Sequence, residues 1–225
     1  MDNYNYHKGM NEIIQELKCL LKTKNIGTDS DRALLLDFQA TLETKPEKAI
    51  KLEKDALAQI ENITADNARL VSNLHANLGG LYRMNGHPDL AREHMEKSIS
   101  LLDQFNLLHI NDSIPQIANY AMFLTEQQEP ERGISELQKL SGIIKEYHSD
   151  DCLDYAKVQE TLGTIYLMTA NLPQAKTHFK RAFKIYEKIW ADEPEMIEAK
   201  YQEIQELYPQ IGFCIGKNLS GLLTK

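Results

Sequence analysis

Two asparagines and three methionines recur at positions where side chains could bind a peptide. Asn77 and Asn119 stand 42 residues apart. Each amide both donates and accepts hydrogen bonds, so each could pair with the backbone of an extended ligand without reading its sequence. Met84, Met122 and Met168 offer long, polarisable side chains that adapt to varied apolar surfaces. These residue types favour a binding surface for a peptide.

The sequence contains none of the common motifs of catalysis or nucleotide binding. There is no HExxH, GxSxG, Walker A loop or GxGxxG. The seven histidines, among them His75 and His94, show no spacing typical of metal ligands. We therefore expect no catalytic residue, no metal and no cofactor, and we predict that the chain is not an enzyme. A deep pocket with paired carboxylates at shifted pKa would favour an enzyme instead.

Composition excludes several classes of partner. The 225 residues carry a formal net charge of −8, whereas nucleic acid and anionic membranes require basic surfaces. We expect neither as a partner. The three cysteines form no pair with framework spacing, the first ten residues resemble no signal peptide, and no apolar stretch reaches the length of a membrane span. These features predict a soluble, cytoplasmic protein with reduced thiols.

Helical periodicity runs through the long segments, and residues typical of helix starts punctuate them. Clusters of N-cap residues stand at 28–31, 64–67, 111–113 and 149–151. Pro46, Pro88 and Pro130 each precede a helical pattern, which suits proline in the first turn of a helix. The chain is therefore predicted to be all-α.

The three prolines are 42 residues apart, and this spacing extends to other positions. Small residues recur in one set and larger apolar residues in another, which is the pattern of two antiparallel helices that cross closely. The set Asp37, Gly79, Ala121 and Gly163 shares this spacing, as do Ala49, Ala91, Gly133 and Ala175, and the large residues Met95, Leu137 and Phe179. A helix pair of this kind buries its apolar face only when further pairs stack on it.

The segment LGxxY at 78–82, followed by Gly86, Ala91, Met95 and Ser98, resembles the tetratricopeptide repeat. LGTIY at 162–166 resembles it more closely. The usual repeat has about 34 residues, and the longer form found here is similar to that of kinesin light chain. HEAT and armadillo repeats have a similar length but lack this arrangement of small residues.

The resemblance implies a right-handed α-α superhelix, or solenoid, of four helix-turn-helix repeats with extra terminal helices. We place the repeats at 30–71, 72–113, 114–155 and 156–197, within a single domain. An amphipathic helix at 8–24 is expected to cap the first repeat, within an N-terminal segment 1–28. Residues 198–225 are expected to cap the last repeat, with one helix ending near Pro209 and a short one at 211–222.

In such a superhelix the first helix of each repeat lines the concave groove. We therefore predict a peptide-binding groove that is formed by Asn73, Asn77, Gly80, Arg83, Met84, Asn119, Met122, Glu126, Lys157, Thr161 and Met168. Arg83 and Lys157 could bind a ligand carboxylate. The first repeat offers more apolar residues there, Leu34, Leu35, Phe38 and Leu42. Two alternatives remain: a merely solvated groove, and a groove filled by the terminal helix of the chain itself.

The expected function is a non-enzymatic scaffold that binds a protein or peptide segment. A ligand-sensing regulatory module that controls a separate effector is the alternative. A homodimer through the terminal helices is plausible, because uncapped solenoid ends expose apolar surface.

Overall fold

The computed structural model describes residues 12–16, 19, 27–110 and 113–207. Within these ranges every regular element is a helix and no residue lies in a strand. The helices are α2 (Asp29–Leu42), α3 (Pro46–Leu57), α4 (Ala68–Met84), α5 (Pro88–Gln104), α6 (Ser113–Glu126), α7 (Pro130–Tyr147), α8 (Leu153–Met168), α9 (Leu172–Ile189) and α10 (Pro194–Leu207). The predicted all-α class is therefore correct, and none of the described helices is long and apolar enough to cross a membrane.

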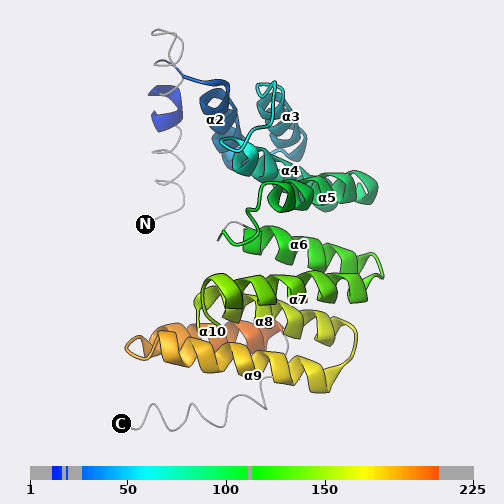
Figure 1. Ribbon diagram of the computed structural model, residues 1–225, viewed down its shortest axis with the longest axis vertical. Helices are drawn as coiled ribbons and strands as arrows, with labels where there is room; N and C mark the ends of the chain where they lie inside the picture. The colour runs from blue at the N-terminus through cyan, green and yellow to red at the C-terminus, as the bar shows by residue number, and fades with distance from the viewer. Residues whose placement is uncertain (1–11, 17–18, 20–26, 111–112, 208–225) are drawn as a thin grey trace. The chain divides into compact units, whose positions relative to one another are not determined.

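The helices pack as consecutive hairpins. In Figure 1, α2 lies beside α3, α4 beside α5 and α8 beside α9, and each of these pairs is in extensive contact. The chain divides into two compact units, residues 1–116 and 117–225, with the boundary inside α6. The first unit holds the first two predicted repeats, and the second unit holds nearly all of the third and the whole of the fourth.

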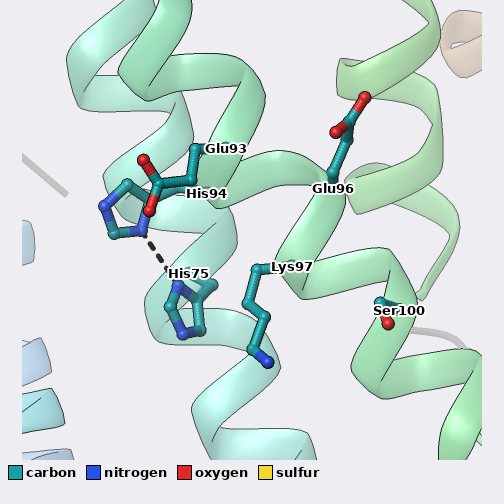
Figure 2. Close-up of a pocket in the computed structure, with 6 residues that line it drawn as sticks. All are labelled: His75, Glu93, His94, Glu96, Lys97 and Ser100. Carbon is teal, nitrogen blue, oxygen red and sulfur yellow. Dashed lines mark hydrogen bonds between the residues drawn. The ribbon is translucent and has the colours of Figure 1, made fainter.

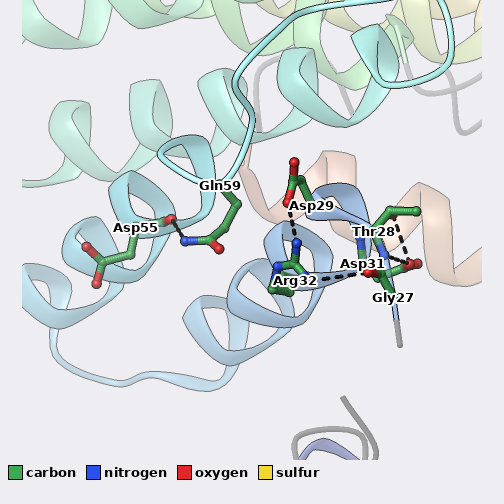
Figure 3. A network of polar contacts seen from close by, with 7 residues as sticks. All are labelled: Gly27, Thr28, Asp29, Asp31, Arg32, Asp55 and Gln59. Carbon is green, nitrogen blue, oxygen red and sulfur yellow. Dashed lines mark hydrogen bonds and ion pairs between the residues drawn. The ribbon is translucent and has the colours of Figure 1, made fainter. Parts of the chain in front are cut away.

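Most helix starts lie where the sequence predicts them. Thr28 caps α2, because its side chain accepts a hydrogen bond from the Asp31 amide while the Asp31 carboxylate accepts one from the Thr28 amide, as Figure 3 shows. Pro46, Pro88 and Pro130 each begin a helix. At 149–151 the prediction is wrong by one residue, since the N-cap of α8 is Cys152, whose Sγ accepts from the Tyr155 amide.

Three first helices end in the same way, although only one of them ends at glycine. Gly86, Gln128 and Ala170 occupy the same position in successive repeats and have positive φ angles of 73°, 65° and 57°. The amide of the residue after each one donates to a carbonyl five residues back, which closes a Schellman turn. These bonds join His87 to Tyr82, Glu129 to Leu124 and Asn171 to Tyr166.

The small residues lie where the two helices of a repeat cross. A Cβ atom on Gly79 would stand 2.5 Å from Cγ of Met95, and one on Gly163 would stand 2.9 Å from the ring of Phe179. Neither position can hold a larger side chain unless Met95 or Phe179 of the second helix is displaced. The predicted close crossings in the second and fourth repeats are therefore confirmed.

The terminal helices match the sequence in part. Residues 12–16 are helical, but Ile14 is buried while Ile13 is 51% exposed, so Ile13 does not lie on the buried face that was expected for it. The other apolar residues predicted there lie outside the described residues, as do Pro209 and the predicted helix at 211–222. α10 packs its Tyr201 and Ile204 against Phe179 and Phe183 of α9.

Candidate peptide-binding face

Four of the predicted ligand-binding residues form one line along α4. Asn73, Asn77, Gly80 and Met84 recur at intervals of four, three and four residues, which places them within one narrow strip of the helix surface. A Cβ atom on Gly80 would meet nothing within 4 Å, and the Met84 side chain is 81% exposed. We call these four residues the α4 strip, which combines amide groups, open space and an exposed apolar side chain.

The two asparagines of the strip already have partners in the first compact unit. The side-chain carbonyl of Asn73 accepts a hydrogen bond from the side-chain amide of Gln116. The Asn77 amide donates to Oδ1 of Asp37 at 2.8 Å and to Oε1 of Glu53 at 3.2 Å. The donors of Asn77 are therefore engaged, and its carbonyl is the group left for a ligand.

Asp37 and Glu53 form an acid pair that the sequence reasoning did not identify as a pair. Burial, followed by the negative charge of Asp37, raises the pKa of Glu53 to about 9. Burial also raises the pKa of Asp37, although hydrogen bonds from Glu53 and Asn77 oppose that rise. The Glu53 carboxyl therefore retains its proton at neutral pH. The sequence did contain a signal for this pair. Asp37 stands in the set of small residues that recur every 42 positions, and Glu53 stands in the corresponding set of large residues.

The Glu53 carboxyl, whose pKa is raised to about 9, is buried, whereas Asp37 is half-buried. Glu53 is only 2% exposed, and it occupies the position that Met95 and Phe179 fill in the second and fourth repeats. The carboxyl group therefore acts as a packing element at a helix crossing, with Asn77 as its hydrogen-bond donor.

In the second compact unit the predicted residues are more dispersed. Asn119 is exposed and makes no hydrogen bond to another described residue, and Met168 is 47% exposed. Lys157 lies 3.7 Å from the carboxylate of Asp154, and the Thr161 hydroxyl donates to the Lys157 carbonyl.

The remaining predicted residues vary in exposure. Glu126 is exposed, whereas Met122 and Arg83 are half-buried. Leu35, which was expected to face the groove, is buried.

The chain's own α10 contacts the fourth repeat. Lys200 forms an ion pair with Glu160 of α8 at 2.8 Å, and the Tyr186 hydroxyl donates to the same carboxylate at 2.6 Å. Leu167 of α8 also packs against the cluster that contains Tyr201 and Ile204. In this repeat, part of the surface that was expected to be open to a ligand is thus covered by the terminal helix.

A shallow depression of about 500 Å³ lies between α4 and α5. It is lined by His75, Glu93, His94, Glu96, Lys97 and Ser100 (Figure 2). The Nδ1 atoms of His75 and His94 are 2.9 Å apart and the ring centroids 5.1 Å, so the rings meet nearly head-on, as in an N–H···N hydrogen bond. Burial lowers the pKa of His75 to about 4, and burial also lowers the pKa of His94, which favours the neutral rings that this bond requires.

The same arrangement recurs in the fourth repeat, which identifies it as a packing element. Tyr82 stacks on His94, and the equivalent Tyr166, two repeats later, stacks on His178. Gln159 replaces His75 and accepts a hydrogen bond from His178 at 2.9 Å. An amide in Gln159 thus replaces the imidazole of His75. The feature common to both repeats is a hydrogen bond to the histidine of the second helix, and a metal is not needed to explain the contact between His75 and His94.

Comparisons with known proteins support a repeat architecture. Residues 113–188 match the family model described as tetratricopeptide repeat, and this range contains α6 to α9. The match covers residues 113–188 and identifies this segment as tetratricopeptide repeats. No curated protein matches the chain significantly in sequence.

Solved structures share the fold at low sequence identity. BtubC (BKLC) from P. vanneervenii has a TM-score of 0.72 at 17% identity, over 95% of this chain and 88% of that one. A putative kinesin light chain from Podosopora anserina, with nearly identical TPR-like repeats, has a TM-score of 0.64 at 13% identity, over 83% and 92%. MamA has a TM-score of 0.55 at 16% identity, over 84% and 96%. The tetratricopeptide solenoid with repeats of the kinesin-light-chain type is thus the fold of this protein.

Proposed function

We propose that this protein is a non-catalytic scaffold that holds a peptide on the α4 strip. The tetratricopeptide fold generally mediates interactions between proteins, which supports the general class. The α4 strip is the observation that carries the specific proposal. An exposed Met84 one turn from Gly80, which faces open space, gives an extended peptide both an apolar contact and room for its backbone.

Peptide chemistry suits the polar groups of this surface. The Asn77 carbonyl can accept from a ligand amide, and Asn119 can both donate and accept. The carboxylate of a peptide ligand is a natural partner for Lys157, whose contact to Asp154 is 3.7 Å long. No reaction is implied by these contacts, because the Glu53 carboxyl behind Asn77 is buried.

Two matched glycine variants test the proposal. Gly80 of α4 and Gly142 of the second helix α7 both face open space, since a Cβ atom at either position would meet nothing within 4 Å. A peptide is first selected from a phage-displayed library of random 12-residue sequences. Its affinity is then measured by isothermal titration calorimetry for the wild type, Gly80→Leu and Gly142→Leu.

We expect Gly80→Leu to weaken binding at least tenfold, because the new side chain fills the space left for the ligand backbone, and Gly142→Leu to have no effect. Asn77→Ala is a poorer probe, since it also removes two hydrogen bonds to the acid pair. Equal affinities for Gly80→Leu and the wild type would show that the ligand does not contact α4.

A further inference from the structure

The second helices α5 and α9 differ in charge at equivalent positions. Arg92 and Glu96 of α5 form an ion pair one turn apart, with Nη1 and Oε1 at 3.9 Å. Lys176 and Lys180 occupy the same two positions in α9, two repeats later, so an attractive pair is replaced by a repulsive one. α5 contains two basic and four acidic residues, whereas α9 contains five basic residues and one acidic residue.

Three lysines of α9 form a line along the surface of the helix. Lys176, Lys180 and Lys184 recur every four residues, and we call them the lysine stripe; the buried Ala182 lies on the opposite side of α9, whereas the buried Phe179 and Phe183 border the stripe. Lys180 and Lys184 are exposed, and Lys176 is half-buried. The stripe is about 12 Å long, because each residue adds about 1.5 Å along the helix.

The positive charge of the stripe is not neutralised by ion pairs. Among the described residues, none of the three lysines forms an ion pair or hydrogen bond through its ammonium group. Lys188, one turn further along, does pair with Asp151. The hydrogen bond and the charge of Lys188 are the main causes of the lowered pKa of Asp151, and the charge of Lys184 adds a smaller effect.

Repulsion along the stripe requires an explanation beyond solubility. Like charges four residues apart destabilise a helix, and α5 shows that this fold accommodates an opposite-charge pair at the same positions. The whole chain carries a net charge of −8, so three adjacent unpaired lysines are a local exception. An anionic ligand would convert this repulsion into attraction.

We propose that the lysine stripe binds an acidic segment of a partner protein in an extended conformation. Lysines four residues apart on a helix are separated by about 6 Å along its axis. Alternate side chains of an extended strand are about 6.6 Å apart and lie on one face. Glutamates at every second position of an extended segment therefore match the three lysines in spacing as well as in charge.

The size of the stripe favours a short acidic peptide over nucleic acid or a membrane. Nucleic-acid binding rests on many phosphate contacts along a continuous polyanion, whereas the stripe offers three charges within an otherwise acidic protein. Exposed aromatic side chains that would stack on bases are absent from the described stripe positions and from the exposed positions between them. A membrane surface would also meet the acidic remainder of the chain.

Fluorescence anisotropy with synthetic peptides tests this proposal in 50 mM salt. The probe is a fluorescein-labelled 11-residue peptide in which glutamate alternates with serine. Its controls are the same peptide with glutamine for glutamate, and a peptide with the same number of glutamates in one consecutive block. The protein is the full chain as wild type, as Lys176→Gln/Lys180→Gln/Lys184→Gln, and as the matched triple variant Lys45→Gln/Lys48→Gln/Lys51→Gln. Both triple variants lower the charge by the same amount, but only the first changes the stripe.

We expect the stripe variant to raise the Kd for the alternating peptide at least tenfold, with little change in the matched variant, and the glutamine peptide not to bind. The single variant Lys180→Glu, which restores the charge pattern of α5, should also abolish binding without lowering the melting temperature. Gly80→Leu should leave this affinity unchanged, because the α4 strip is a different surface.

Equal losses in the two triple variants would overturn the proposal, since net charge would then explain the binding. Equal affinity for the alternating and block peptides would overturn the spacing argument. Tighter, stripe-dependent binding of a 12-nucleotide single-stranded DNA or of phosphatidylserine vesicles would assign the stripe to another class of ligand.

Discussion

The first repeat and the second repeat solve the same packing problem with opposite chemistry. In the second repeat Gly79 makes room for Met95, and the fourth repeat does the same with Gly163 and Phe179. In the first repeat the equivalent pair is Asp37 and Glu53, two acids that both accept hydrogen bonds from Asn77, with Glu53 protonated at neutral pH. One crossing is stabilised by close apolar packing, and the other by hydrogen bonds between groups that are costly to bury.

This difference extends to pH dependence, because each repeat contains buried titratable groups of opposite kind. Glu53 has a raised pKa of about 9, whereas His75 of the second repeat has a lowered pKa of about 4. Protonation of Glu53 therefore stabilises the first repeat, whereas protonation of His75 destabilises the second repeat. Neighbouring repeats with nearly the same backbone thus respond to pH in opposite directions.

The largest expected effect comes from removing the large apolar side chain at a helix crossing. Phe179 is fully buried where α9 packs against α8 and α10, so Phe179→Ala should cost about 3–5 kcal/mol in the free energy of unfolding. Urea denaturation followed by circular dichroism measures this loss. Glu53→Ala at the equivalent position should cost less, and an equal or greater cost would show that the two crossings do not differ as described.

Substitutions at two neighbouring glycines, Gly79 and Gly80, test the close approach of α4 and α5 in the second repeat. A methyl group at Gly79 would overlap Met95, so Gly79→Ala should cost about 1–3 kcal/mol through overpacking. Gly80→Ala is the control: its methyl group meets nothing, and it should stabilise α4 by roughly 0.5–1 kcal/mol. Melting temperatures that change in the same direction for both variants would argue against a specific crossing at Gly79.

The acid pair of the first repeat should make stability fall as pH rises. The folded state holds the Glu53 proton up to about pH 9, whereas the unfolded chain releases it near 4.5. The stabilisation is therefore complete below about pH 4.5 and is lost as pH rises through 9, by at most about 1.4 kcal/mol per pH unit for one proton. Urea denaturation between pH 5 and 9 should show this slope, and Glu53→Gln should remove it.

Glutamine at position 53 keeps a donor for Asp37 but does not titrate, which makes the variant selective. Glu47→Gln on the exposed face of the same helix is the control and should retain the slope. A Glu53→Gln protein with an unchanged slope would assign the pH dependence to other groups.

The smallest effect is expected where the second repeat is made to resemble the fourth. His75→Gln reproduces the contact between Gln159 and His178, so at pH 7.5 its stability should lie within about 0.5 kcal/mol of the wild type. Stabilisation by neutral His75 is present above about pH 6.5 and is lost as pH falls toward 4. The variant should therefore lose less stability than the wild type at pH 5, as thermal unfolding at both pH values would show.

Much of the repeat architecture was predictable, because its signals are local and recur. The regular repeat period, the prolines that begin α3, α5 and α7, and the small residues at the crossings all follow from side-chain size and backbone restriction. The turn after α4 was also predictable, since Gly86 tolerates a positive φ. Its counterparts Gln128 and Ala170 carry no such signal, and the repeat geometry imposes the same φ on them.

The candidate binding face was predictable only as a set of positions. Periodicity placed Asn77, Gly80 and Met84 on one side of α4, and the structure leaves Gly80 and Met84 open. The sequence periodicity did not reveal that Asn77 is held by Asp37 and Glu53, because these residues come from α2 and α3 and meet only after the helices pack. Nor did it reveal that α10 places Lys200 against Glu160.

The amino-acid sequence by itself determined the helices, their pairing into repeats and the residues that allow close crossing. These features depend on properties of single residues and on the 42-residue spacing at which those residues recur. Tertiary structure alone decided which polar side chains remain available and which are consumed internally. The reason is physical: a carboxyl or amide group acquires its pKa and its partners from burial and from neighbours that are distant in the chain. Asn77 and Asn119 illustrate this, since the Asn77 amide donates to Asp37 and Glu53, whereas Asn119 at the equivalent position makes no hydrogen bond to another described residue.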